Sequence, residues 1–169
     1  NLILDKILIT HSHFDHIKYL NDFIDMYPCT EIYASSECKI KQEFIDIVHN
    51  EIISIGEEII VALYTPGHYY DSICYWNKDH SIVFTGDTIF VGRTGRTINK
   101  GSCIEKLYDS VYNILLKLPA TTIIYPGHHY GFKKKITIEE NIKNSIFFQC
   151  NTLDEFKIVM TNYENNRKL

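Results

Sequence analysis

The run THSHFDH, residues 10–16, places several potential metal-binding side chains within one short stretch of the chain. It holds His11, His13, Asp15 and His16. On an extended backbone, side chains two residues apart leave on the same side, so His11 and His13 can aim at one point. Asp15 and His16 follow at the start of an expected helix and can aim back at that point. Imidazole binds Zn, Fe, Mn or Ni, and a carboxylate is a natural bridging ligand, so this stretch predicts a metal site.

Three more candidate ligands stand where other apolar strands are expected to end. VALYTPG leads to His68, SIVFTG leads to Asp87 and TIIYPG leads to His128. Ligands at the ends of several strands can converge above one edge of a sheet, where loops shape a pocket. An isolated His is more often an ordinary core or surface residue, but this combination favours a metal centre. The whole set exceeds the needs of one tetrahedral ion and fits two ions that share Asp87: His11, His13, Asp15, His16, His68, Asp87 and His128.

The other histidines and the cysteines are expected outside this ligand set. His49 and His80 have the character of surface residues, and His129 is left open as a residue that supports a ligand from behind. The five cysteines are scattered, odd in number and without a C-x-x-C pair, which argues against a disulfide framework and a thiolate zinc site. Each is expected to be a small buried apolar residue: Cys29, Cys38, Cys74, Cys103 and Cys150.

Short apolar strands alternate with helical patterns along the chain, and these elements must position the ligands. Strands are expected over residues 2–4, 7–10, 31–34, 58–64, 72–76, 81–85 and 121–125, with a hairpin turn at 77–80. Helices are expected over 15–27, 36–49 and 102–118. Three capping boxes are expected to open helices, and the polar last 20 residues or so are expected to fray: Ser102 with Glu105, Thr137 with Glu140, and Thr152 with Glu155. The alternation predicts an α/β layered domain with a mixed sheet.

Length and charge limit the classes of function. The 169 residues suit a single domain over 1–169, and the net charge of −4 gives no basic field for nucleic acid. No stretch approaches the roughly 18 apolar residues of a membrane span. Free cysteines favour an intracellular location, cytoplasmic or organellar. The chain opens inside an apolar run without Met, so we expect an N-terminal truncation from which a targeting segment can be missing.

These motifs resemble the metallo-β-lactamase superfamily, specifically its glyoxalase II-like and persulfide dioxygenase-like branch. The match runs in order through THSHFDH, TPGHYYDS, FTGDTIF and YPGHHYG. The resemblance implies an αββα four-layer sandwich, here without the N-terminal strands of that fold, with the site at one edge of two sheets. It implies that the first metal is held by His11, His13 and His68. The second would be held by Asp15, His16 and His128, and Asp87 would bridge the two metals.

The chain departs from the pattern of this branch in two further places. The family often reads TPGHTPG where this chain has residues 65–71, so bulky side chains and a carboxylate stand near the pocket mouth. Glyoxalase II carries an F-E-G segment and a longer helical tail, whereas this chain has VGRTGR at 91–96 and a short tail. The loop and tail look more like the persulfide dioxygenases and related small hydrolases.

The leading hypothesis is hydrolysis of a small glutathione-type thioester, assisted by two divalent ions, zinc before iron or manganese. Asp87 and Asp15 are the candidate catalytic carboxylates, the latter also orienting hydroxide. Arg93 and Arg96 are candidates for binding a substrate carboxylate, and Tyr130 for a hydrogen bond. The expected partner is a small thiol-derived molecule, with neither nucleic acid nor membrane, and a homodimer is allowed.

Two other hypotheses stay open at this stage. One is an iron-dependent glutathione persulfide dioxygenase, with a single iron on His11, His13 and either Asp87 or His68. The ligand residues do not separate it from the hydrolase. The other is a non-catalytic metal-binding domain.

Overall fold

Two β-sheets face each other in the computed structural model, which describes residues 3–166. The first sheet has three parallel strands in the order β1 (Lys6–Leu8), β2 (Glu31–Ser35) and β3 (Ile45–Ile47). The second has six strands in the order β11-β10-β7-β6-β5-β4. Their bounds are β4 (Ile52–Ile55), β5 (Glu58–Tyr64), β6 (Ile73–Asn77), β7 (Ile82–Gly86), β10 (Ile123–Pro126) and β11 (Ile136–Thr137). A short hairpin, β8 (Ile89–Phe90) and β9 (Arg93–Thr94), follows β7.

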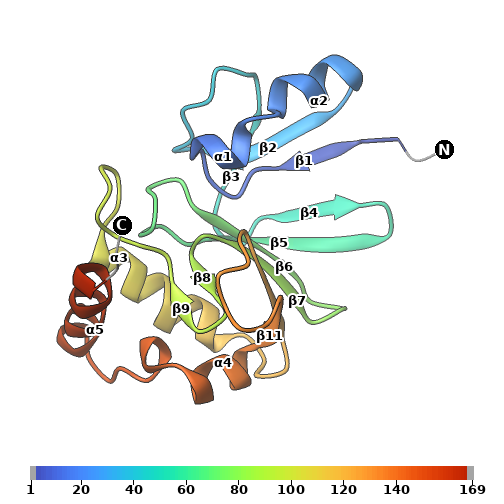
Figure 1. The fold of residues 1–169 in the computed structure, drawn as a ribbon. Coiled ribbons are helices and arrows are strands. Elements are labelled where there is room, and N and C mark those ends of the chain that lie inside the picture. The colour runs from blue at the N-terminus through green and yellow to red at the C-terminus, as the bar shows by residue number, and fades with distance from the viewer. Residues whose placement is uncertain (1–2, 167–169) are drawn as a thin grey trace.

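Helices cover the outer face of each sheet, as Figure 1 shows. Helices α1 (Phe14–Ile17) and α2 (Leu20–Met26) lie on the first sheet. Helix α3 (Ile104–Asp109), α4 (Ile138–Asn144) and α5 (Leu153–Asn166) lie on the second. Helix α3 continues through a π-helical turn over Ser110–Ile114 and a 3-10 turn over Leu115–Lys117, and a further 3-10 turn spans Ile146–Phe148. The layer order is therefore αββα, as predicted.

The alternation of side chains along the central strands builds the cores on both faces of the second sheet. On β5, Ile60 and Ala62 point into the core between the sheets, while Leu63 faces the helices. On β6, Ile73 and Tyr75 likewise belong to the inter-sheet core and Cys74 to the helix side. Strands buried on both faces read as continuous apolar runs, which is why these segments were recognisable from sequence.

Strand direction brings the ends of several strands to one edge. Strand β5 is antiparallel to β6, β6 is antiparallel to β7, and β7 is parallel to β10. The C-terminal ends of β5, β7 and β10 therefore lie together. The backbone N–H of Ile73 donates to the carbonyl of Thr10 at 2.7 Å, which joins the end of the β1 segment to the same edge.

The helix expected over 36–49 is wrong. A turn follows β2, and residues 45–47 form β3, with Ala34 opposite Asp46 and Ser35 opposite Ile47. Ile47 is 1% exposed in the inter-sheet core. Pairing with the open edge of β2 and burial of a β-branched residue together outweigh the helical spacing of the segment.

Other expectations need smaller corrections. The helix expected over 15–27 is split into α1 and α2. In the strand expected at 2–4, Leu2 lies outside the described residues, and residues 3–4 form no strand. Strand β4 was not predicted, although its pairing with β5 across the Gly56 turn is regular.

The capping predictions had mixed outcomes. The Thr137–Glu140 box is complete, and Thr152 accepts from the backbone of Glu155. The box expected at Ser102 is wrong, since Cys103 precedes the helix without a side-chain cap and Ser102 donates to the carbonyl of Asn99. The expected fraying of the tail is also wrong through Asn166, because α5 buries Phe156 and Met160 completely.

Among residues 3–166, no helix combines the length and apolar character that crossing a membrane requires.

Candidate metal centre

Three imidazoles converge at the end of the β1 segment. His11 Nε2 lies 3.0 Å from His13 Nδ1, and His68 Nε2 lies 3.1 Å from that same His13 nitrogen. His11 is 1% exposed and His68 is 5% exposed, so these nitrogens meet away from bulk water. We call these three residues the buried triad.

A second group lies beside the buried triad and is more open to solvent. His16 Nε2 lies 3.3 Å from His128 Nε2, and His128 Nε2 lies 3.1 Å from Asp15 Oδ2. Helix α1 supplies Asp15 and His16, while His128 follows β10. We call these three residues the outer triad.

Asp87 stands between the two triads. Its Oδ1 lies 3.2 Å from His16 Nε2, and its Oδ2 lies 3.7 Å from His68 Nε2 and 3.6 Å from His128 Nε2. One carboxylate thus faces imidazoles from both triads, which is the placement that a bridging ligand requires.

The donor set fits divalent cations better than it fits a hydrogen-bond network. Tetrahedral zinc with Zn–N bonds of 2.0–2.1 Å separates ligand nitrogens by about 3.3 Å, close to the spacing in both triads. In each of three groups of these residues, the potential ligand atoms lie within 4.8 Å of one another. The buried Oδ1 of Asp87 has no geometrically satisfied hydrogen bond among the described residues, although His16 Nε2 lies 3.2 Å away. A cation would satisfy it.

The backbone around the site orients one imidazole and leaves room for the carboxylate. The carbonyl of Arg96 accepts a 3.0 Å hydrogen bond from His68 Nδ1, which leaves the lone pair on Nε2. Two glycines allow close packing here. A Cβ at Gly95 would lie 2.8 Å from His68 Cγ, and one at Gly127 would lie 2.6 Å from Asp87 Oδ1.

Burial and neighbouring charges divide the histidines electrostatically. Burial, with nearby imidazoles, lowers the pKa of His11 to about 2, and burial also lowers the pKa of His13 and His68. Burial acts against protonation of His16 too, but contact with Asp87 outweighs it and raises that pKa. Burial opposes the charge of Asp87, yet His16 and the other imidazoles hold its pKa below the ordinary value. Neutral imidazoles and an ionised carboxylate are the forms that bind metal.

The residues predicted to bind substrate lie beside this centre. A narrow cavity of about 30 Å³ is lined by His68, Asp87, Phe90, Arg93, Thr94, Arg96, Tyr130 and Tyr163. The guanidinium of Arg93 lies 4.6 Å from the ring centre of Tyr130, and the Tyr130 ring stacks on His128 at 5.0 Å. The structure therefore brings Arg93, Arg96 and Tyr130 to the metal centre.

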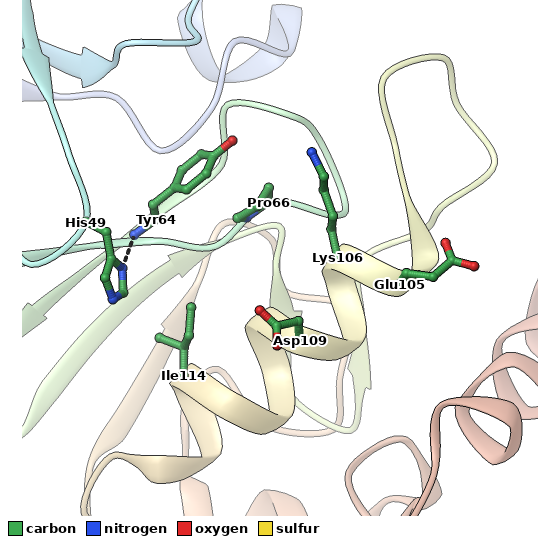
Figure 2. A pocket seen from close by; sticks show the side chains of 7 residues that line it. All are labelled: His49, Tyr64, Pro66, Glu105, Lys106, Asp109 and Ile114. Carbon is green, nitrogen blue, oxygen red and sulfur yellow. Dashed lines mark hydrogen bonds between the residues drawn. The ribbon is translucent and has the colours of Figure 1, made fainter.

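A larger cavity lies elsewhere. It has a volume of about 680 Å³ and is lined by His49, Tyr64, Pro66, Glu105, Lys106, Asp109 and Ile114 (Figure 2). None of the seven candidate ligands lines it, and its one imidazole, His49, accepts a hydrogen bond from the backbone of Tyr64. Chemistry rather than size identifies the site, because only the smaller cavity borders convergent ligand atoms.

Some residues of the site were missed from sequence. Tyr163 comes from α5, far from every motif. Tyr69 is one of the bulky side chains expected near the pocket mouth, but its contact with His13, at 4.1 Å between ring centres, was not predicted. The YPGH spacing could have indicated Gly127, but no sequence signal pointed to Tyr163. His49, His80 and His129 are exposed, as expected for the first two. All five cysteines are free. Cys38, Cys74 and Cys150 are buried as expected, whereas Cys29 is exposed and Cys103 is only half-buried.

Comparison with known proteins identifies the family. The family model described as the metallo-beta-lactamase superfamily matches residues 4–128. The chain belongs to this superfamily. It is 32% identical over 168 residues to a probable polyketide biosynthesis zinc-dependent hydrolase, BaeB, of Bacillus velezensis, covering 97% of this chain and 72% of the relative.

Two other relatives place the chain within the superfamily. A hydroxyacylglutathione hydrolase of Francisella tularensis subsp. novicida is 34% identical over 76% of this chain, but the match spans only 51% of that protein. The crystal structure of ETHE1 from Myxococcus xanthus aligns with a TM-score of 0.87 at 30% identity, over 99% of this chain and 72% of that one. The chain thus fits the glyoxalase II-like and ETHE1-like branch, as the sequence predicted.

Proposed function

We propose that this chain is a metal-dependent hydrolase that cleaves a small, glutathione-type thioester. The observation that carries the proposal is the position of Asp87 between the two triads, within 3.7 Å of imidazole nitrogens from both. The zinc-dependent hydrolase and the hydroxyacylglutathione hydrolase among the relatives support this reaction class.

The buried triad would hold one divalent ion, the outer triad would hold a second, and Asp87 would bind both. We expect these ions to be zinc. When bound, the ions would supply an acidified water and polarise the thioester carbonyl. The side chains around the metal centre would transfer the proton and bind the substrate. Asp15, 58% exposed at its side chain, is placed to accept a proton and to orient the attacking water. Arg93 would bind a carboxylate of the substrate, with Arg96 beside it, and the Tyr130 hydroxyl would donate a hydrogen bond.

The persulfide dioxygenase is the second candidate, and the likeness to ETHE1 over 99% of this chain favours it. In that case a single iron would use part of the same donor set. The two candidates differ in metal count and in consumption of oxygen, not in the residues that line the site.

The deciding experiment measures thioester cleavage and oxygen uptake side by side on freshly purified protein. Hydrolysis of a hydroxyacyl-glutathione thioester without oxygen uptake would support the hydrolase. Oxygen uptake with glutathione persulfide, and no hydrolysis, would support the dioxygenase instead. The Asp87→Asn variant should lose whichever activity is found, and unchanged turnover on both substrates would favour a non-catalytic metal-binding domain.

A further inference from the structure

A buried carboxylate, that of Asp71, lies behind the ligand run and belongs to neither triad. It is 1% exposed. Its Oδ2 accepts a 3.1 Å hydrogen bond from the backbone N–H of Ser12. Ser12 sits between His11 and His13, so this bond holds the peptide from which both imidazoles of the buried triad depart.

The environment of Asp71 is unfavourable for a carboxylate. Its Oδ1 is buried and has no hydrogen-bond partner within the described part of the chain. Burying a carboxylate with incomplete hydrogen bonding is costly. Such exceptions in a native structure call for a specific explanation.

The surroundings of Asp71 make it a fixed point rather than a mobile group. The backbone N–H of Ile73, two residues on, donates to the carbonyl of Thr10 at 2.7 Å. The loop after His68 is therefore tied to the ligand run twice, once by backbone and once by the side chain of Asp71. The thiol of Cys38 lies next to Asp71, and burial raises its pKa to about 11, so this neighbour stays uncharged.

We propose that Asp71 is a positioning residue that fixes the Ser12 peptide, so that His11 Nε2 and His13 Nδ1 face one divalent cation. It does not touch the cation. The 3.0 Å approach of those two nitrogens is then set before metal binds, because the amide between them cannot turn. This inference rests on the proposed binding of metal by the buried triad.

The test compares Zn²⁺ affinity among single-substitution variants of this chain by competition with a chromophoric chelator. Asp71→Ala removes the acceptor and should weaken Zn²⁺ binding about ten-fold or more. Asp71→Asn keeps an oxygen acceptor and should stay within about three-fold of the original chain. Ser72→Ala is the matched control, because Ser72 is 2% exposed and its Oγ has no hydrogen-bond partner among residues 3–166. It should bind Zn²⁺ normally.

The absorption spectrum of the Co²⁺-loaded protein adds a readout that a purely structural role would not change. Asp71→Ala should shift the ligand-field bands, while Asp71→Asn and Ser72→Ala should not. If the original chain binds Zn²⁺ and Asp71→Ala matches it in affinity and spectrum, the positioning role of Asp71 is overturned while the proposed metal centre stands. It is also overturned if Asp71→Asn is as weak as Asp71→Ala. If the original chain binds neither Zn²⁺ nor Co²⁺, both the proposed metal centre and the positioning role of Asp71 are overturned.

Amide hydrogen exchange of the unmutated, metal-free chain keeps the inference testable if Asp71→Ala does not fold. The Ser12 amide should be protected as strongly as the amides of β1. Free exchange of the Ser12 amide with solvent would overturn the positioning role.

Discussion

Arg93 donates a 2.9 Å hydrogen bond from Nη1 to the hydroxyl of Tyr163, 70 residues further along the chain. Close by, Glu164 accepts from the backbone of Thr97 at 2.7 Å. Helix α5 therefore holds both ends of the loop whose Arg96 carbonyl orients His68. The C-terminal helix is part of the support of the metal centre, and it presents Arg93 in one fixed orientation.

Replacing Tyr163 with Phe should raise KM for a carboxylate-bearing substrate about five-fold to ten-fold, with a smaller change in kcat. A hydrogen bond to a charged group is worth about 1.5–3 kcal/mol, and its loss frees the Arg93 guanidinium. Steady-state kinetics measures the effect. Tyr108→Phe is the control, because Tyr108 packs beside Tyr112 away from the metal centre. Equal kinetics for Tyr163→Phe and the original chain would show that Arg93 needs no such support.

Replacing Gly127 with Ala should remove metal from the outer triad and lower activity about 10-fold to 100-fold. The new Cβ would lie 2.6 Å from Asp87 Oδ1 and 2.8 Å from His16 Cε1, so one of these ligands must move. Metal analysis and turnover check the prediction. Gly56→Ala, in open space on the β4–β5 turn, should reduce stability because of its positive φ but keep both ions. Full metal content and activity in Gly127→Ala would contradict the bridging geometry.

The metal-free protein should lose stability as the pH falls below about 6.5. Burial lowers the pKa of His11 to about 2 from its ordinary value of 6.5. Between these values the unfolded chain binds a proton that the folded chain does not, so each such imidazole destabilises the fold by about 1.4 kcal/mol per pH unit. His13 and His68 act in the same direction, whereas the raised pKa of His16 opposes them. Urea unfolding of the metal-free chain at pH 7 and pH 5.5 measures the slope, which should be smaller in His11→Gln. Equal slopes for the two chains would contradict the assignment.

Replacing Ser110 with Ala should lower the free energy of unfolding by about 1–2 kcal/mol. Ser110 is 1% exposed, and its Oγ donates to the carbonyl of Pro66 at 2.6 Å, so the change leaves a partly buried carbonyl without that donor. Thr122→Val serves as the comparison, since the buried Thr122 Oγ1 has no hydrogen-bond partner among the described residues. It should be close to neutral in urea unfolding. A larger loss for Thr122→Val than for Ser110→Ala would argue against this account of the helix-to-turn contact.

The sequence was most informative where residues that can bind metal stand at the ends of predicted strands. Residues at the ends of apolar strands, such as His68 and Asp87, could be placed together because strands of like direction end at one edge of a sheet. The alternation of elements predicted an α/β layered domain with a mixed sheet, and the αββα order of the layers was implied by the resemblance alone. The buried stripe of Leu107, Val111 and Leu115 was readable because its spacing is helical, and the structure buries all three completely.

Long-range contacts account for most of what was missed. The segment 45–47 has no distinctive local signal, and only the open edge of β2 makes it a strand. Tyr163 reaches the site because α5 packs against α3 and the 3-10 turn over Ile146–Phe148, and no local pattern encodes that packing. Asp71 was recognised as a carboxylate near the pocket mouth, but its burial against the Ser12 amide depends on the loops of two sheets meeting.

The metal-to-protein ratio of freshly purified protein, measured by inductively coupled plasma mass spectrometry, tests the central claim most directly. The position of Asp87 between the two triads predicts two divalent ions per chain. A single iron per chain, or no bound metal, would contradict the two-metal hydrolase.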